Sequence, residues 1–240
     1  MTPLLTAVWF DIDGTLLDAR GVGRGVYARA LKAFHGIEDD LAWVRFAGAT
    51  DLDILHQVAD RHGLGRNTLD SDTFFAAMAE EMDRSLAADP PLLLPGVREL
   101  VEALSRRPDI RLGLITGNDR ACAFHKLHHA GLPGKFLIGG FGHEHPERDV
   151  LAGLAVDRMV ATLGPGEEIA RAFLLGDTPR DAKAAKVIGA TAIGVATGPY
   201  SVADLLANGC DHAVESLSDT EMLLGLIAPR GDAEQHGLPD

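Results

Sequence analysis

The chain has 240 residues, with 35 acidic and 22 basic side chains, so its formal net charge is −13 when histidine is neutral. Its hydrophobic fraction of 46% and charged fraction of 24% are those of a globular protein and exclude a disordered or fibrous chain. Because an acidic chain without a lysine or arginine run repels polyanions, we expect no binding to nucleic acid and none to an anionic membrane. The length allows one large domain or two small ones.

The amino-terminal segment carries no pattern of a membrane anchor or secretion signal. Its apolar stretch ends at Asp11, which makes it too short to span a bilayer, and no basic region precedes it. The two cysteines, Cys122 and Cys210, form no CxxC pair, and a chain of this size needs no disulfide. We therefore expect a soluble, cytoplasmic protein.

Short continuous apolar runs bounded by turn residues are typical of buried parallel strands. The chain contains four such runs, at residues 5–10, 111–115, 172–176 and 191–196. The first three end at a polar residue, which is Asp11, Thr116 or Asp177. In open α/β sheets, ligands bind beyond the carboxyl ends of the strands, so these three side chains are expected to gather at one site.

Helical segments are expected between the predicted strands. Amphipathic spacing predicts three helices between the first two strands, at residues 26–34, 51–60 and 73–86. Two further helices are expected, from Leu94 towards Ser105 and over residues 179–188. Strands that alternate with helices indicate an α/β fold with a doubly wound parallel sheet, and the three early helices form an insertion after its first strand.

The octapeptide from Asp11 to Asp18, DIDGTLLD, directly follows the first predicted strand. Asp11 and Asp13 lie two residues apart in the loop at the strand end, where Gly14 allows the backbone to turn sharply. One carboxylate of such a pair can attack an electrophile while the other transfers a proton, and together they can hold a divalent cation. For an isolated DxD, an Asp-Gly turn that only caps the next segment would be favoured. The full string after an apolar strand favours the catalytic interpretation.

This octapeptide resembles DxDGTLxD, the first signature of the haloacid dehalogenase-like hydrolase superfamily. The resemblance continues at Thr116, which matches the hydroxyl residue of the second signature, and at residues 176–181, GDTPRD, which are similar to the fourth signature, GDxxxD. Capping of a turn or helix would explain Thr116, Asp177 or Asp181 one at a time, but their shared order and strand-end placement favour the family. The resemblance covers nearly the whole chain and implies a Rossmann-like catalytic core with an inserted, all-helical cap.

The third signature of the superfamily commonly contains a lysine, and here the sequence departs from that pattern. Lys135 precedes the expected position, so Arg148, which opens a predicted helix towards Met159, is the better match. It resembles the branch of the superfamily that uses arginine in this role. Arginine keeps the positive charge and adds a planar fork suited to two phosphoryl oxygens. An exposed helix arginine without a functional role is the alternative.

In this superfamily, the helical insertion acts as a cap over the catalytic loops. We expect a core of residues 1–17 and 93–230, a cap of residues 18–92 and a flexible tail of residues 231–240. Within the cap, residues 46–51, FAGATD, are similar to the GxT loop of phosphoglycolate phosphatase-like members, which reaches into the active site. Capping of the helix that begins at Asp51 is a sufficient local role for Thr50, and substrate contact is an added hypothesis.

The resemblance also implies a role for each site residue. Asp11 would attack phosphorus and form an aspartyl-phosphate, while Asp13 would protonate the leaving oxygen and then activate water. Mg²⁺ would be the cofactor, and its expected ligands are Asp11, the backbone carbonyl of Asp13, Asp177 and Asp181. The residues expected to bind the substrate are Thr116, Gly117, Asn118, Arg148 and Thr50, of which Thr116 and Arg148 are also expected to assist catalysis.

Other functions share parts of this pattern. A haloacid dehalogenase would use Asp11 but would need neither Asp13 nor a metal, so Asp13 favours phosphoryl chemistry. A β-phosphoglucomutase-like sugar-phosphate mutase shares the motif, the helical cap and Mg²⁺, and differs in how long the phosphate stays on the aspartate. A noncatalytic phosphate-binding regulatory module would leave the cap and Asp13 without a role.

We therefore predict a Mg²⁺-dependent phosphatase that hydrolyses a small phosphorylated metabolite, and only the GxT loop points towards phosphoglycolate. The sequence is compatible with a monomer and with a homodimer. The net charge of −13 does not exclude an anionic substrate, because a divalent cation and Arg148 can reverse the local field.

Overall fold

The computed structural model describes residues 4–66, 69–132, 134–136 and 138–228. Its centre is a six-stranded sheet in the order β5-β4-β1-β6-β7-β8, in which every neighbouring pair is parallel. Four strands coincide with the predicted apolar runs: β1 (Leu4–Phe10), β4 (Ile110–Ile115), β6 (Glu168–Gly176) and β7 (Thr191–Val195). Two short edge strands complete the sheet: β5 (Gly139–Gly140) and β8 (His212–Val214). The predicted doubly wound α/β fold is confirmed.

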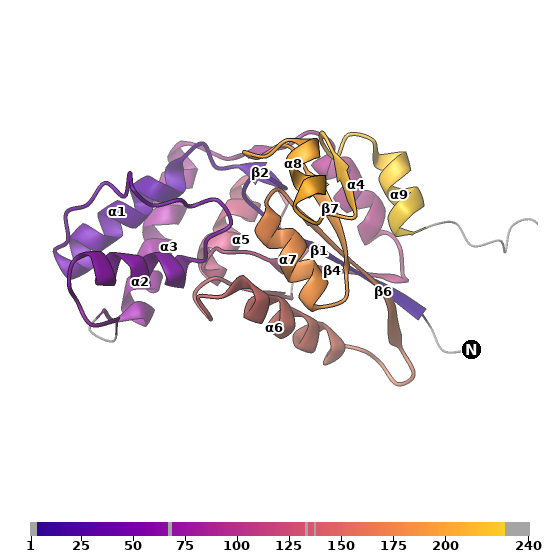
Figure 1. Ribbon diagram of the computed structural model, residues 1–240, viewed down its shortest axis with the longest axis horizontal. Coiled ribbons are helices and arrows are strands. Elements are labelled where there is room, and N and C mark those ends of the chain that lie inside the picture. Colours follow the sequence, from indigo (N-terminus) through magenta and orange to yellow (C-terminus); the bar gives the residue numbers. More distant parts are fainter. Residues whose placement is uncertain (1–3, 67–68, 133, 137, 229–240) are drawn as a thin grey trace, which may run out of the picture.

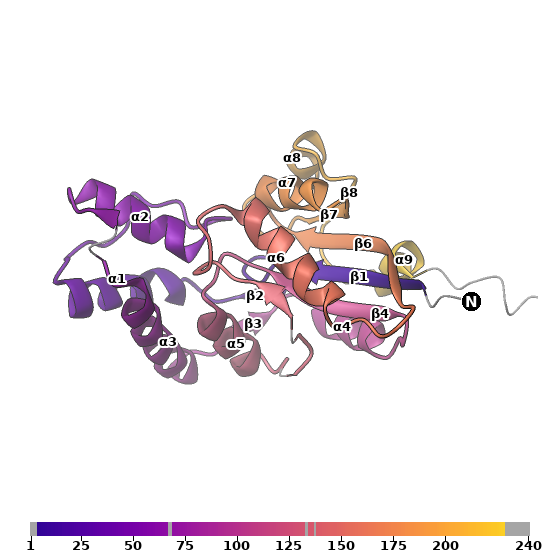
Figure 2. The ribbon, with the colours of Figure 1, turned by 90° about the horizontal axis from the view of Figure 1, so that it is seen from below.

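Helices cover both faces of this sheet, as Figures 1 and 2 show. One face packs against α4 (Val97–Ser105), α5 (Arg120–His129) and α9 (Thr220–Ile227). The other face packs against α6 (Arg148–Val160), α7 (Pro179–Val187) and α8 (Val202–Ala207). The alternation of side chains along β1 explains the two layers, because Val8 and Phe10 enter the first cluster whereas Ala7 and Trp9 enter the second.

Three helices form a separate layer at one end of the molecule (Figure 1): α1 (Val22–His35), α2 (Asp51–Arg61) and α3 (Ser71–Ala88). They enclose their own hydrophobic cluster, in which Tyr27 and Phe74 are fully buried. A short antiparallel pair, β2 (Leu17–Asp18) with β3 (Leu92–Leu93), joins the two chain segments that connect these helices to the sheet. The inserted all-helical cap is thus present.

We propose that the cap begins and ends where the chain crosses between the sheet and the three helices. The pairing of β2 with β3 supports placing these two boundaries near residues 18 and 92, because both connections run side by side at that point. The tail expected at residues 231–240 lies outside the described residues. Cys122 and Cys210 are both free and buried, and they belong to different hydrophobic clusters. Among the described helices, none has the length and apolar character required to cross a membrane.

The loop before α2 and the first residues of α2 lie directly against the loops that follow β4 and β5. The backbone N–H of Asp51 donates to the carbonyl of Gly117 at 2.8 Å, and that of Leu52 donates to the carbonyl of Gly142 at 2.9 Å. A Cβ atom on Gly117 would lie 1.9 Å from the carbonyl oxygen of Ala49, so only glycine permits this approach of cap and core.

We expect Gly117→Ala to lower the free energy of unfolding by about 2 kcal/mol or more, because the backbone of the cap loop must move to accept the methyl group. Gly153→Ala is the matched control, because Gly153 lies within α6 and a Cβ atom added there meets no atom within 4 Å. This control should gain about 0.5–1 kcal/mol from helix propensity. Urea denaturation measures both variants, and equal stabilities would contradict the close approach.

Candidate active site

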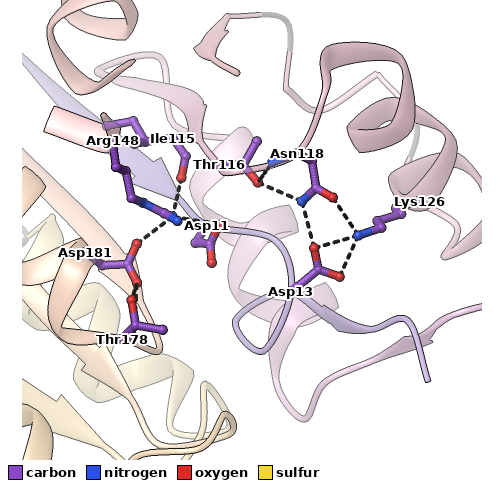
Figure 3. A network of polar contacts seen from close by, with 9 residues as sticks. All are labelled: Asp11, Asp13, Ile115, Thr116, Asn118, Lys126, Arg148, Thr178 and Asp181. Atoms are coloured by element: carbon purple, nitrogen blue, oxygen red, sulfur yellow. Dashed lines mark hydrogen bonds and ion pairs between the residues drawn. The ribbon is translucent and has the colours of Figure 1, made fainter. Parts of the chain in front are cut away.

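The parallel sheet brings the predicted strand-end residues to one edge. Strands β4, β1 and β6 are neighbours, so Thr116, Asp11 and Asp177 follow adjacent strands at their carboxyl ends. The first turns of two helices add Arg148, at the start of α6, and Asp181, in α7. Figure 3 shows the guanidinium of Arg148 in contact with both Asp11 and Asp181, which come from separate elements.

Arg148 is enclosed among carboxylates and is only 6% exposed, so it is no surface arginine. Its Nη2 atom lies 2.8 Å from Asp11 Oδ1 and 2.6 Å from Asp181 Oδ1, and it donates to the carbonyl of Ile115 at 2.8 Å. Asp181 also completes the cap of α7, where its Oδ2 accepts from the backbone N–H and the hydroxyl of Thr178. The helix cap therefore fixes the carboxylate that Arg148 contacts.

Asp11, Asp177 and Asp181 form a buried acidic cluster in which one oxygen of each lies within 4.8 Å of the others. Burial raises the pKa of Asp11 to about 6, because the charge of Arg148 opposes it only in part while Asp181 and Asp13 add to it. Burial, together with the charges of Asp11 and Asp181, raises the pKa of Asp177 to about 9. One guanidinium thus does not balance three carboxylates.

The cluster fits a hard divalent cation. Asp177 Oδ1 is buried and accepts no hydrogen bond. Asp181 Oδ1 forms an ion pair with Arg148, but the geometry of this contact is not that of a hydrogen bond. Buried carboxylate oxygens without donors are costly unless a cation or proton satisfies them, and oxygen ligands are those that Mg²⁺ prefers. The side chain of Asp13 lies outside this cluster, so three of the four predicted metal residues offer carboxylates here.

We expect Mg²⁺ to raise the melting temperature more at pH 8.5 than at pH 5.5. A carboxyl whose pKa is raised in the folded protein holds its proton more tightly there, so the metal-free fold loses stability as the pH rises through about 6 and about 9. Mg²⁺ must displace these protons, so its binding tightens as the pH rises. Thermal unfolding with and without Mg²⁺ tests this, and Asp177→Asn should remove most of the shift. An equal Mg²⁺ shift at both pH values would contradict it.

A second set of polar residues surrounds Asp13, apart from the contacts of Arg148, as Figure 3 shows. Asn118 Nδ2 donates to Asp13 Oδ2 at 2.7 Å and to the hydroxyl of Thr116 at 2.9 Å. Lys126 Nζ donates to both Asp13 oxygens, at 2.8 and 2.7 Å, and to Asn118 Oδ1 at 2.6 Å. These contacts orient the Asp13 carboxylate from the loop after β4, which contains Asn118, and from the last turn of α5, which contains Lys126.

Lys126 was not predicted as a site residue. It is only 4% exposed. Burial by itself would lower its pKa, but the charge and hydrogen bonds of Asp13 and the charge of Asp51 raise it overall, so the ammonium stays charged. The signal in the sequence is its place on α5, where Cys122, Ala123 and Leu127 share the buried face with it. A lysine on an apolar helix face requires a partner.

A cavity of about 480 Å³ opens over both groups, between the sheet edge and the cap helices. Of the predicted substrate-binding residues, Gly117, Asn118 and Arg148 line it. Thr116 and Thr50 are buried and absent from the lining. The hydroxyl of Thr50 accepts from Asp53 N at 3.1 Å and donates to the carbonyl of Pro146 at 3.0 Å, so its visible role is to cap α2 and join cap to core.

The fold and the arrangement of acidic residues agree with the family that the motifs resemble. Residues 5–189 match the sequence profile of the haloacid dehalogenase-like hydrolases, so the chain belongs to this family. The family is one of hydrolases, and two curated relatives of the chain are named as phosphatases.

Three similar proteins are relevant. A phosphoglycolate phosphatase of Rhodospirillum rubrum is 27% identical over 243 residues, which cover 94% of this chain and 93% of that protein. The structure of a hydrolase from Pseudomonas syringae is 22% identical, with a TM-score of 0.65 over 93% of this chain and 99% of that one. The structure of CbbY from Rhodobacter sphaeroides in complex with phosphate is 20% identical, with a TM-score of 0.64 over 90% and 96%. At these identities, the two structures support the fold.

Proposed function

We propose that this protein is a Mg²⁺-dependent phosphatase that hydrolyses a small phosphorylated metabolite through an aspartyl-phosphate on Asp11. The observation that carries this proposal is the position of Asp11, which is buried beside Arg148 within the acidic cluster and yet lines a cavity that the cap helices cover. Asp13, two residues further on, lines the same cavity with its own set of partners. Membership of the hydrolase family and the phosphatase name of a nearly full-length relative support it.

The chemistry needs a nucleophile and a group that moves a proton. A carboxylate oxygen of Asp11 attacks phosphorus in line, the phosphorus–oxygen ester bond breaks, and Asp13 gives its proton to the leaving oxygen. Asp13 then takes a proton from water, the hydroxide attacks phosphorus, and phosphate leaves while the Asp11 carboxylate is restored. Each proton that Asp13 gives is thus regained in the second step.

The other residues position and neutralise the phosphoryl group. Mg²⁺, when held by Asp11, the carbonyl of Asp13, Asp177 and Asp181, supplies positive charge against the phosphoryl oxygens. Arg148 adds a fixed cation beside Asp11, and Asn118 and Gly117 line the cavity next to it. Thr116 supports Asn118 through its hydroxyl, and Thr50 holds the cap loop against the core.

The preferred substrate of this proposal is 2-phosphoglycolate, because the phosphoglycolate phosphatase relative aligns over nearly the whole chain. The test is phosphate release from a panel of phosphorylated metabolites, with and without Mg²⁺. Mg²⁺-dependent release from 2-phosphoglycolate is the expected result. Absence of turnover on every phosphate ester would contradict the proposal and favour a noncatalytic phosphate-binding module.

The mutase alternative has its own test. A hexose 1-phosphate is incubated with the protein, and both the sugar phosphates and free phosphate are measured. A phosphatase releases free phosphate, whereas a mutase yields the 6-phosphate without it. Formation of the 6-phosphate alone would replace the proposed hydrolysis by a mutase reaction.

A further inference from the structure

The wall of the cavity contains a buried ammonium group, that of Lys126, which none of the family motifs assigns. Its three hydrogen bonds go to Asp13, twice, and to Asn118, and both of these partners line the cavity too. Two of the three N–H donors of the Lys126 ammonium group thus bind the same carboxylate, that of Asp13. One donor can therefore turn to a substrate oxygen while another still holds Asp13.

The other cations of the described cavity lining, Arg24 and Arg148, have different partners from Lys126. Arg148 is enclosed by Asp11, Asp181 and the carbonyl of Ile115. The guanidinium of Arg24 donates to two backbone carbonyls of the cap and stacks 4.7 Å from the centre of the Phe46 ring. Of these three cations, Lys126 is thus the one that contacts Asp13, the residue proposed to protonate the leaving oxygen.

The space beside Lys126 is suited to a negative group. The first turn of α1 borders it, because Gly21 and Gly23 line the cavity and a Cβ atom on Gly23 would lie 4.0 Å from Lys126 Nζ. Helix α1 begins at Val22 after the N-cap residue Gly21, which provides no side-chain cap, and its first turn has no acidic residue. Its amino end therefore adds partial positive charge to that of the ammonium.

We propose that Lys126 determines substrate specificity by binding a carboxylate of the substrate, so that the enzyme prefers phosphate esters of short hydroxy acids. This inference rests on the proposed phosphatase function. Asp13 must lie about 3 Å from the ester oxygen to give it a proton, and Lys126 Nζ lies 2.7 Å from Asp13. In a phosphorylated 2-hydroxy acid, one carbon separates that oxygen from the carboxylate, which places the carboxylate within reach of Lys126.

The test compares 2-phosphoglycolate with ethyl phosphate, which has the same length and no carboxylate. For the native enzyme, we expect kcat/KM for 2-phosphoglycolate to exceed that for ethyl phosphate by about 30-fold or more, because only 2-phosphoglycolate can pair a carboxylate with the buried ammonium of Lys126. Lys126→Met keeps the length of the side chain and removes the charge. It should reduce this ratio at least tenfold, whereas Lys126→Arg should restore much of it.

A second variant keeps Lys126 and Asp13 in place. Gly23→Asp puts a carboxylate beside the ammonium at a helix terminus that favours acidic residues, so it should compete with the substrate carboxylate. We expect its KM for 2-phosphoglycolate to rise about tenfold or more, and the ratio between the two substrates to fall accordingly. If Lys126→Met fails to fold, Gly23→Asp still tests whether the substrate carboxylate binds next to Lys126.

The outcomes separate the inference from the proposed function. If the native enzyme hydrolyses both esters equally well, or if Lys126→Met lowers both by one common factor, Lys126 only positions Asp13 and the specificity role is overturned while the phosphatase stands. An unchanged ratio in Gly23→Asp would also overturn it. If no phosphate ester is hydrolysed, the proposed function itself fails, and the inference fails with it.

Discussion

Asp11→Asn is expected to reduce Mg²⁺-dependent phosphate release by at least about a thousandfold, because a carboxamide cannot attack phosphorus and the aspartyl-phosphate cannot form. The fold should survive the change. Burial raises the pKa of Asp11 to about 6, so its charged form is disfavoured in the metal-free protein, and a neutral side chain of the same shape removes that penalty. At pH 8 in the absence of Mg²⁺, the variant should therefore be at least as stable as the native protein.

The control for this prediction is Asp157→Asn, the same chemical change at an exposed position of α6. Its phosphate release should match that of the native protein. The two measurements are steady-state hydrolysis of p-nitrophenyl phosphate and thermal unfolding without metal. An Asp11→Asn protein that is folded and retains a tenth of the activity would contradict the nucleophile assigned to Asp11.

The sequence predicts the centre of this molecule well because two local rules determine it. Continuous apolar runs identified β1, β4, β6 and β7, and parallel strands necessarily bring their carboxyl ends to one edge. The gathering of Asp11, Thr116 and Asp177 follows from these two rules alone. The edge strands β5 and β8 have two and three residues, which is too short for any periodicity to appear.

Contacts between side chains that are far apart in the sequence follow no such local rule. Lys126 reaches Asp13 because α5 turns its buried face towards the cavity, and it lies outside the third motif, where the family pattern places its cation. Arg45 of the cap contacts the hydroxyl of Tyr200, which lies 155 residues further along the chain. Capping is local, so the hydrogen bond of Thr50 to Asp53 could be predicted, whereas its contact with Pro146 could not.

The second large effect is expected for Arg148→Met, which keeps an apolar stem and removes the buried guanidinium. Asp11 and Asp181 would lose their ion-pair partner while Asp177 stays beside them, so the cluster would hold three carboxylates and no cation. Removing one partner of a buried ion pair commonly costs about 3–5 kcal/mol of unfolding free energy. We expect a loss of this size at pH 8 without Mg²⁺, with phosphate release reduced at least about a hundredfold.

The pH dependence distinguishes lost charge from lost packing in Arg148→Met. Because the charge of Arg148 lowers the pKa of both Asp11 and Asp177, its removal raises them further, and protonation at low pH relieves the repulsion. The loss of stability should therefore be smaller at pH 5 than at pH 8 in urea denaturation. A loss that is equal at both pH values would instead assign Arg148 a packing role. Arg148→Lys keeps the charge but is too short to reach Asp11, Asp181 and Ile115 together, so it should recover stability more fully than activity.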